Sequence, residues 1–97
     1  MAIGSLIVRL LVRESRSLKD KRQVVRSILD RVRGGFNVSA AEVDSQDDVK
    51  VATLGFAVVA GESAAARSVL SEIAEALRKH PVAEYLGSDL TIGNEVV

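Results

Sequence analysis

The chain has 97 residues, a length that suits one domain and excludes a second independent core. With 47% hydrophobic and 27% charged residues it is typical of a soluble globular protein, and the absence of cysteine excludes disulfides, thiol catalysis, zinc ribbons and iron–sulfur clusters. The formal net charge is zero, but residues 1–33 hold nine Lys or Arg against three Asp or Glu, whereas residues 34–97 hold four against ten. This asymmetry indicates a polyanionic partner for the basic N-terminal third.

The first predicted element is a strand over residues 2–13, in which side chains alternate between two faces. One face would carry Leu6, Val8, Leu10 and Val12, and the other Ile7, Arg9, Leu11 and Arg13. A period of two over this length indicates a strand with one fully apolar face. Because Arg9 interrupts a short apolar stretch, a signal peptide or membrane span is not expected, and we expect a cytoplasmic protein without membrane contact.

A helix is predicted to begin after Ser17 and to end at Gly34-Gly35. Ser17 can cap the first turn, and Asp20, three positions on, completes a capping-box pattern with Asp in place of Glu. Apolar residues recur at helical spacing along it: Leu18, Val25, Ile28, Leu29 and Val32.

The rest of the chain predicts three strands and a second helix. In order, they are a strand over residues 36–43, a polar loop over 44–48, a strand over 49–60, a helix from a Ser63 cap to about His80, and a weaker strand over 85–92. Pro81 ends the second helix, and we expect His80 to bond the last helix carbonyls. Residues from Gly93 onward are expected to fray.

This order of elements predicts one α+β, ferredoxin-like βαββαβ domain over residues 1–97, with an ordered core over about residues 2–92. In this topology the antiparallel four-stranded sheet has the order 4-1-3-2, and both helices cover one face. The fold hosts many unrelated activities, so it predicts no function by itself.

Several segments of the chain resemble, in the same order, the YlxP-like family of small bacterial proteins, a domain of unknown function. They are Ser17–Arg22, Phe36–Ser39, Ala41–Val43, Gln46-Asp47 and Leu54-Gly55. The resemblance covers most of the chain and implies a ferredoxin-like fold. Genes of the family often lie among those for translation initiation and ribosome maturation, which implies a ribosome-linked role. It implies no enzymatic activity.

Four basic residues of the first helix are predicted to lie within about 60° of one another. They are Lys19, Arg22, Arg26 and Arg33. Together with Lys21 they are the candidate nucleic-acid-binding residues, and ribosomal RNA or a ribosomal subunit is the candidate partner, without sequence readout of DNA. Cations in a first turn oppose the helix macrodipole, a cost that favours a function. The alternative is an ordinary solvated helix face.

Lys21 is predicted to point into the apolar arc of the helix, about 200° around the wheel from the direction of Lys19. In the predicted topology, Glu42 lies on the inward face of the second strand at the same end of the sheet. We therefore predict a Lys21–Glu42 ion pair. Either it is a structural pair at the margin of the core, or it belongs to a functional pocket.

The face of the sheet away from the helices is predicted to carry small and apolar side chains without aromatics, which excludes base stacking of the RNA-recognition-motif type. The candidate dimer face consists of Ile7, Arg9, Leu11, Arg13, Thr53 and Ala57. A monomer tolerates a contiguous apolar face poorly, so we predict a homodimer through the sheet. The alternative is that the C-terminal segment folds back over part of it.

No residue set completes a catalytic or metal centre. Asp44, Asp47 and Asp48 match no calcium loop, and His80 is the only histidine, so we predict no metal, no cofactor and no enzyme. The leading hypothesis is a non-enzymatic RNA- or ribosome-associated accessory protein. The alternative is a dimeric regulatory or structural module that binds a protein partner or a small anion.

Overall fold

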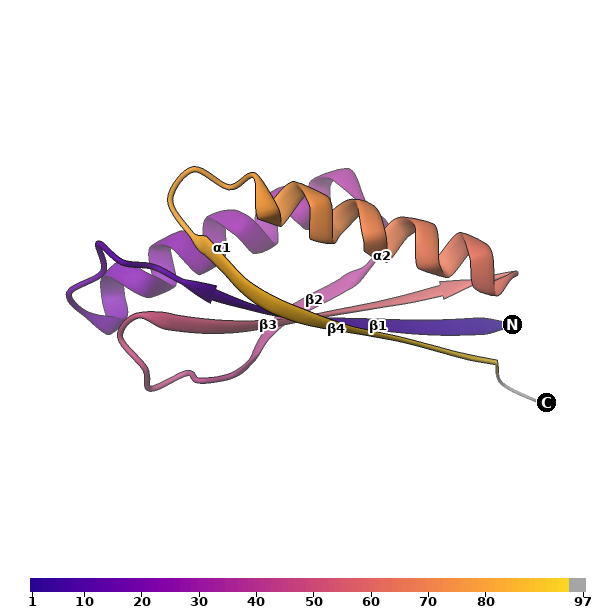
Figure 1. Ribbon diagram of the computed structural model, residues 1–97, viewed down its shortest axis with the longest axis horizontal. Coiled ribbons are helices and arrows are strands. Elements are labelled where there is room, and N and C mark those ends of the chain that lie inside the picture. The colour runs from indigo at the N-terminus through magenta and orange to yellow at the C-terminus, as the bar shows by residue number, and fades with distance from the viewer. Residues whose placement is uncertain (95–97) are drawn as a thin grey trace.

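A computed structural model describes residues 1–94, which form an antiparallel sheet with both helices on one face (Figure 1). The elements are β1 (Ala2–Leu11), α1 (Leu18–Gly35), β2 (Ser39–Asp44), β3 (Val51–Ala60), α2 (Ser63–Arg78) and β4 (Glu84–Asn94). The sheet order is β2-β3-β1-β4, which confirms the predicted ferredoxin-like topology.

β1 is an inner strand with a partner on each side. It pairs with β3 from Ala2↔Ala60 to Leu11↔Val51, and with β4 from Ala2↔Asn94 onward. The register with β4 shifts between Arg9 and Leu10. Gly93 and Asn94 lie in this ladder, so the expectation that they fray is wrong, and residues 95–97 lie outside the described residues.

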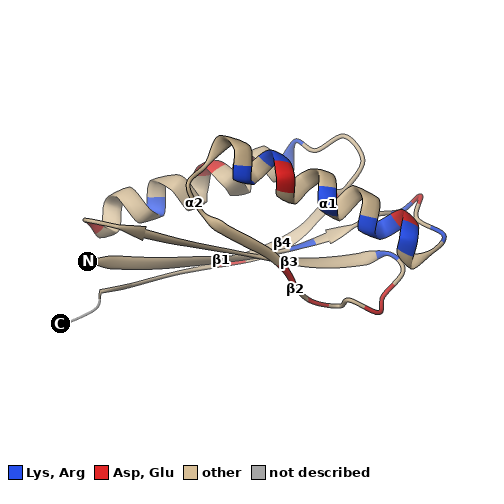
Figure 2. Ribbon diagram, turned by 180° about the vertical axis from the view of Figure 1, so that it is seen from behind, with Lys and Arg blue, Asp and Glu red and all other residues tan. Residues whose placement is uncertain are grey.

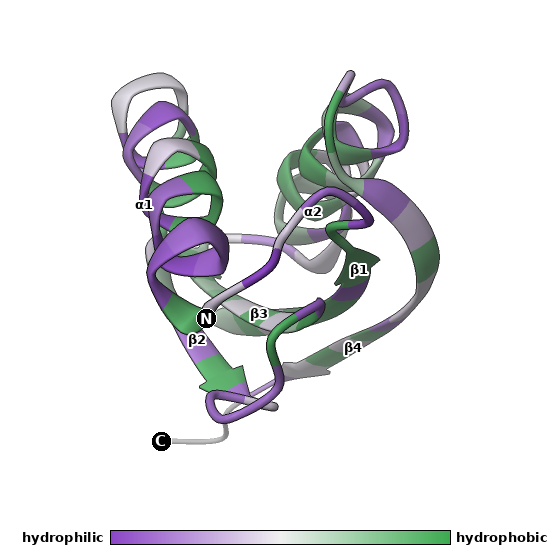
Figure 3. Cartoon of the chain, turned by 90° about the vertical axis from the view of Figure 1, so that its left-hand side faces the viewer, coloured by the Kyte–Doolittle hydropathy of each residue, from purple (hydrophilic) through white to green (hydrophobic). Residues whose placement is uncertain are grey.

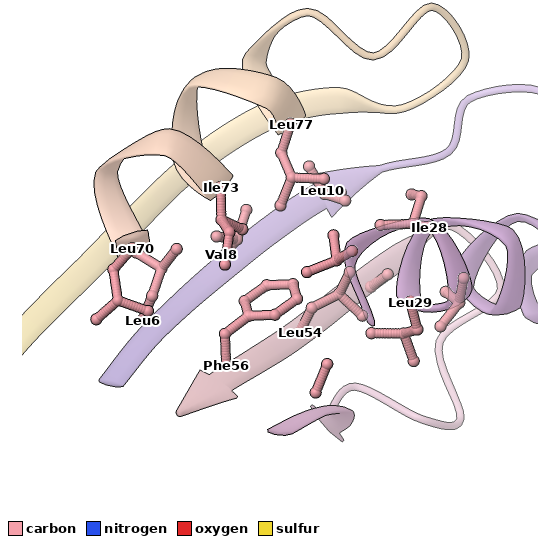
Figure 4. Packing of buried hydrophobic residues seen from close by; sticks show 14 of the residues in the cluster. Leu6, Val8, Leu10, Ile28, Leu29, Leu54, Phe56, Leu70, Ile73 and Leu77 are labelled. Carbon is pink, nitrogen blue, oxygen red and sulfur yellow. The ribbon is translucent and has the colours of Figure 1, made fainter. Parts of the chain in front are cut away.

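The core fills the layer between the sheet and the helices (Figure 4). Its large buried side chains come from the inward faces of β1 and β3 and from both helices: Leu6, Val8, Leu10, Leu54, Phe56, Ile28, Leu29, Leu70, Ile73 and Leu77. Full burial of each such side chain contributes about 1.5–3 kcal/mol. The two helices stand apart over the sheet (Figure 3), with α1 against β2 and α2 against β1 and β4.

Hydrogen bonds at the helix N-termini differ in part from the predicted caps. Ser17 Oγ accepts from the N–H of Asp20 (3.1 Å), but the Asp20 carboxylate accepts from the N–H of Arg16 (3.0 Å) rather than from Ser17. Ser63 does not cap α2: the cap residue is Glu62, which makes no side-chain cap bond. Ser63 is the first helical residue, and its hydroxyl donates to Asn94 Oδ1 (3.0 Å) at the end of β4.

Local turns shorten the two strands of the β2–β3 hairpin relative to the prediction. The N–H of Phe36 still bonds the carbonyl of Val32 in α1 (2.9 Å), so the strand begins only at Ser39. Asp48 Oδ1 accepts from the N–H groups of Lys50 and Val51 (2.8 Å each), and this turn delays the start of β3 to Val51.

Candidate functional site

Lys21 is completely buried beneath the first turn of α1, with a side-chain exposure of 0%. Its ammonium Nζ donates to three backbone carbonyls, those of Ser45 (2.7 Å), Gln46 (3.4 Å) and Val51 (3.1 Å). Nζ also lies 3.1 Å from Glu42 Oε2, so the structure brings the predicted pair together. This contact is electrostatic, because Oε2 has no hydrogen-bond partner among the described residues.

The position of Lys21 corrects one prediction. A fully buried ammonium cannot reach a phosphate, so Lys21 does not belong among the nucleic-acid-binding residues. The charge instead compensates carbonyls of the β2–β3 loop and of the first residue of β3, and it ties that loop to α1. Ser45 at the loop start has a φ of 58°, a left-handed conformation that non-glycine residues rarely adopt.

Lys19, Arg22 and Arg26, here called the basic row, lie exposed on the outer side of α1. Figure 2 shows basic positions along this helix. None of the three forms an ion pair or a side-chain hydrogen bond within residues 1–94. The row therefore presents three cations to solvent with no internal structural task.

Arg33, the fourth predicted member, is engaged differently. One of its guanidinium nitrogens donates to the carbonyl of Ala40 in β2, and the other lies 3.5 Å from Asp30 Oδ1. These contacts fasten the end of α1 to β2. Arg33 is thus exposed but tethered, unlike the basic row.

The open face of the sheet contains a shallow hollow of about 380 Å³ over β1, β2 and β3. Its rim includes Ile7 and Ala57, both exposed, and its floor includes Gly55. A Cβ at Gly55 would lie 2.7 Å from Val43 Cγ1, so a larger residue there would require the Val43 side chain to move. Polar groups in the hollow are limited to backbone and the hydroxyls of two serines, Ser5 and Ser39.

Other members of the predicted dimer face lie in different surroundings. Arg9 lies 3.7 Å from Asp89, and Arg13 lies 2.8 Å from Glu84. Leu11 is half-buried. Thr53 differs from the other five members of the predicted dimer face because it is buried, with only 6% of its surface exposed.

The burial of Thr53 has a local cause. The register of β2 against β3 shifts between Glu42 and Asp44, and Ser45 Oγ lies 2.9 Å from Thr53 Oγ1. The hydroxyl pair covers Thr53, so its assignment to the dimer face is wrong.

The side chain of His80 closes the turn after α2 instead of bonding the last helix carbonyls; only its backbone N–H donates to one of them, that of Leu77 (3.2 Å). Its Nδ1 accepts from the N–H groups of Val82 (3.2 Å) and Ala83 (3.0 Å). Partial burial is the main cause that lowers the pKa of His80, and the charge of Arg31 lowers it further. The predicted role of His80 is therefore corrected to that of a neutral acceptor for two backbone donors.

The acidic loop does not assemble into a metal centre. The Asp48 carboxylate serves the backbone of the turn, and the N–H groups of Val51 and Lys50 lower its pKa. Over residues 1–94, no three His, Asp or Glu side chains lie close enough to share a metal ion. Neither helix in this range is both long and apolar enough to cross a membrane.

Sequence reasoning missed two polar side chains that shape the end of the molecule near Lys21. Ser15 is buried; its hydroxyl donates to the carbonyl of Val49 (2.6 Å) and also lies 3.0 Å from the carbonyl oxygen of Ser17. Lys50 Nζ donates to the carbonyls of Arg13 (2.6 Å) and Ser15 (2.9 Å). Hydrophobic periodicity does not identify these two residues. Their side chains hydrogen-bond to loop carbonyls and do not belong to the apolar face of a helix or strand.

Comparison with known proteins adds to this geometry. A family model described as "Protein of unknown function (DUF503)" matches residues 3–90. The "Uncharacterized protein YlxP" of Bacillus subtilis (strain 168) is 30% identical over 82 residues, which cover 84% of this chain and 89% of that protein. The solution NMR structure of a de novo designed protein with a ferredoxin fold aligns with a TM-score of 0.52 at 20% identity, covering 100% of this chain and 88% of the designed one. That likeness shows the fold alone.

Proposed function

This chain belongs to the YlxP-like family of proteins of unknown function (DUF503), and we propose that it is a non-enzymatic accessory protein that associates with ribosomal RNA or a ribosomal subunit. The basic row of Lys19, Arg22 and Arg26 would contact phosphates. We propose that the protein is cytoplasmic. RNA is available there, and a chain without cysteine forms no disulfides that would need an oxidising compartment.

One observation carries the proposal: three neighbouring cations have no partner within residues 1–94. The segment from Lys19 to Arg26 spans about 10 Å along the helix axis, enough for more than one phosphate contact. Lys19, in the first turn of α1, opposes the macrodipole and lowers stability slightly, and no member of the row serves the internal structure.

The expected recognition is electrostatic and depends little on sequence. Lys and Arg contacts to phosphates release counterions, so affinity falls steeply as salt rises. No aromatic side chain lies on the open face within residues 1–94, and nothing in the basic row reads base edges. Binding would therefore follow the shape and charge density of the RNA.

Co-sedimentation with ribosomal subunits and with free ribosomal RNA tests the proposal at low and near-physiological salt. We expect salt-sensitive binding by the wild type and none by Lys19→Glu/Arg22→Glu/Arg26→Glu. A matched comparison uses Arg22→Glu/Arg26→Glu against Arg67→Glu/Lys79→Glu, which changes the net charge equally on α2 and at the C-cap residue that follows it. Absence of wild-type binding at low salt, or equal losses in the two double variants, would contradict the proposal.

We also propose that the protein is a homodimer that pairs through the open sheet face. The hollow beside Ile7 is apolar, and the same face carries two cations and two anions, in the pairs Arg9–Asp89 and Arg13–Glu84. A second copy related by a two-fold axis would cover the hollow without gathering charge of one sign.

Analytical ultracentrifugation tests the dimer with a charge placed in the hollow. We expect Ile7→Glu to raise the dimer dissociation constant by at least about tenfold, because it would bury a carboxylate at the interface. Ser71→Glu, on an exposed position of α2, is the control and should leave association unchanged. A wild type that sediments as a monomer at all concentrations overturns the dimer proposal and favours a different protein partner for this face.

A further inference from the structure

A groove separates α1 from the C-terminal part of α2 and the loop that follows it. It is lined by α1 from Gln23 to Val32, by Phe36 just after that helix and by residues between 76 and 82, and we call it the interhelical groove. It consists of two adjoining hollows of about 330 and 290 Å³, which share Arg31, His80 and Pro81. The separation of the helices over the sheet is visible in Figure 3. Its size suits a small molecule.

The floor of the interhelical groove is apolar and its charged lining is entirely cationic. Ile28, Val32 and Leu77 form the base. Arg31 and Lys79 are exposed, and neither side chain makes an ion pair or a hydrogen bond within residues 1–94. No Asp or Glu is among the lining residues of either hollow. An anion in the groove would therefore meet positive charge and no opposing carboxylate.

The imidazole of His80 adds a hydrogen-bond donor to this lining. Nδ1 is occupied as an acceptor for the N–H groups of Val82 and Ala83, so the proton of the neutral ring is on Nε2. Burial and the nearby charge of Arg31 both favour this neutral form. The ring nitrogen that the loop leaves free is thus a donor.

We propose that the interhelical groove binds a small organic anion, in which a carboxylate or phosphate monoester is joined to an aliphatic body. The oxyanion would bond the Arg31 guanidinium and His80 Nε2–H, with Lys79 adding charge, and the aliphatic body would cover Ile28 and Val32. A pocket with an apolar base and a few convergent polar groups is the usual design of small-ligand sites.

The site is separate from both surfaces already proposed. Arg31 lies about 120–180° around α1 from the three members of the basic row, so one RNA strand would not engage both. The hollow on the open sheet face carries no charged lining residue, and it offers an anion no partner. Charge complementarity therefore favours the interhelical groove over the sheet hollow for an anionic ligand.

An NMR titration of the full ¹⁵N-labelled chain tests the proposal with three octyl probes: octanoate, octyl phosphate and the neutral octanol. We expect saturable shifts of the Val82 and Ala83 amides with at least one of the anions, and about tenfold weaker binding of octanol, since octanol lacks the charge-assisted hydrogen bonds. The tighter of the two anions identifies the headgroup as carboxylate or phosphate.

Two variants locate the site. Arg31→Gln should weaken binding of the better anion by about tenfold, whereas Arg22→Gln, the same change in the basic row, should leave it unchanged. Lys79→Gln should cause a smaller loss in the same direction, because Lys79 acts as a more distant charge. Equal affinity for octanol, no effect of Arg31→Gln, or shifts centred on Gly55 in the sheet hollow would each overturn the proposal.

Discussion

Lys21 and Arg22 are neighbours in the chain and both are basic, but they lie in opposite environments on α1. Lys21 is fully buried against loop carbonyls and Glu42, while Arg22 is exposed and has no ion-pair partner within residues 1–94. The basic segment at the start of α1 is therefore two regions with two tasks. The position of each residue around the helix, together with the carbonyls beneath the helix, determines that Lys21 stabilises the fold and that Arg22 is free to contact a ligand.

The two regions also differ in how charge contributes to stability. Moving a charge out of water costs several kcal/mol, and Lys21 offsets this cost through carbonyl bonds and the Glu42 carboxylate. Exposed cations such as those of the basic row contribute close to zero. The comparison can be tested by changing one region at a time.

The largest expected effect is on the buried side. Lys21→Met should lower the free energy of unfolding by about 3 kcal/mol or more, because it leaves the Glu42 carboxylate and loop carbonyls without their partner. Urea denaturation measures the loss. The control Arg22→Met should change stability by less than about 0.5 kcal/mol. Similar losses in both variants would contradict the division of α1 into two regions.

On the exposed side, the expected effect is on RNA binding rather than stability. Arg26→Gln should reduce the slope of log affinity against log salt by about 0.7–0.9, the contribution of one phosphate contact. The measurement is a filter-binding titration with ribosomal RNA across a salt series. Arg67→Gln on α2 is the matched control, and an equal change in its slope would show that binding follows overall charge alone.

The N-cap of α1 is expected to stabilise the first turns of the helix, which contain both Lys21 and Arg22. Ser17→Ala removes the acceptor for the Asp20 N–H and should cost about 1 kcal/mol of unfolding free energy. The control Ser27→Ala, at an exposed interior position of the same helix, should be neutral or slightly stabilising. Thermal denaturation measures the loss of stability in each variant. An equal loss in both would show that the Ser17 cap makes no specific contribution to stability.

The smallest expected effect is a pH dependence of the free energy of unfolding. It comes from His80, which lines the interhelical groove together with Arg31. The folded-state pKa of His80 is lowered from 6.5, so the unfolded chain takes up a proton first as pH falls. Stability from this group is present above pH 6.5 and is lost as pH falls toward the folded-state pKa. Urea unfolding at several pH values from neutral to mildly acidic should show this loss.

A variant separates His80 from the carboxylates. His80→Asn can keep an acceptor for the Val82 and Ala83 N–H groups while removing the titration. We expect its stability to fall less than that of the wild type over the same pH interval. Identical pH profiles would assign the loss to other groups.

The order of elements and the burial of Lys21 could be predicted because both follow from periodicity. Alternation in β1 and the helical spacing of Val25 to Val32 place each apolar face, and the same wheel angle places Lys21 inward. These properties repeat along an element, so one wrong residue does not change the result.

The missed features depend on single contacts that no repeat marks. Thr53 is covered because a register shift in β2 brings Ser45 over it. His80 turns toward two N–H groups of its own loop, and Ser63 toward Asn94 across the fold. Each depends on loop backbone that is fixed only once the tertiary structure exists.

The central placement of β1 has a consequence for how the chain folds. Ala2 is paired with Ala60 on one side and with Asn94 on the other, so β1 is completed by strands made much later. Contacts of this sequence separation slow folding relative to a helical bundle of the same size. During synthesis, both edges of β1 stay open until β3 and then β4 emerge, and an apolar strand with open edges is the state most exposed to misassociation.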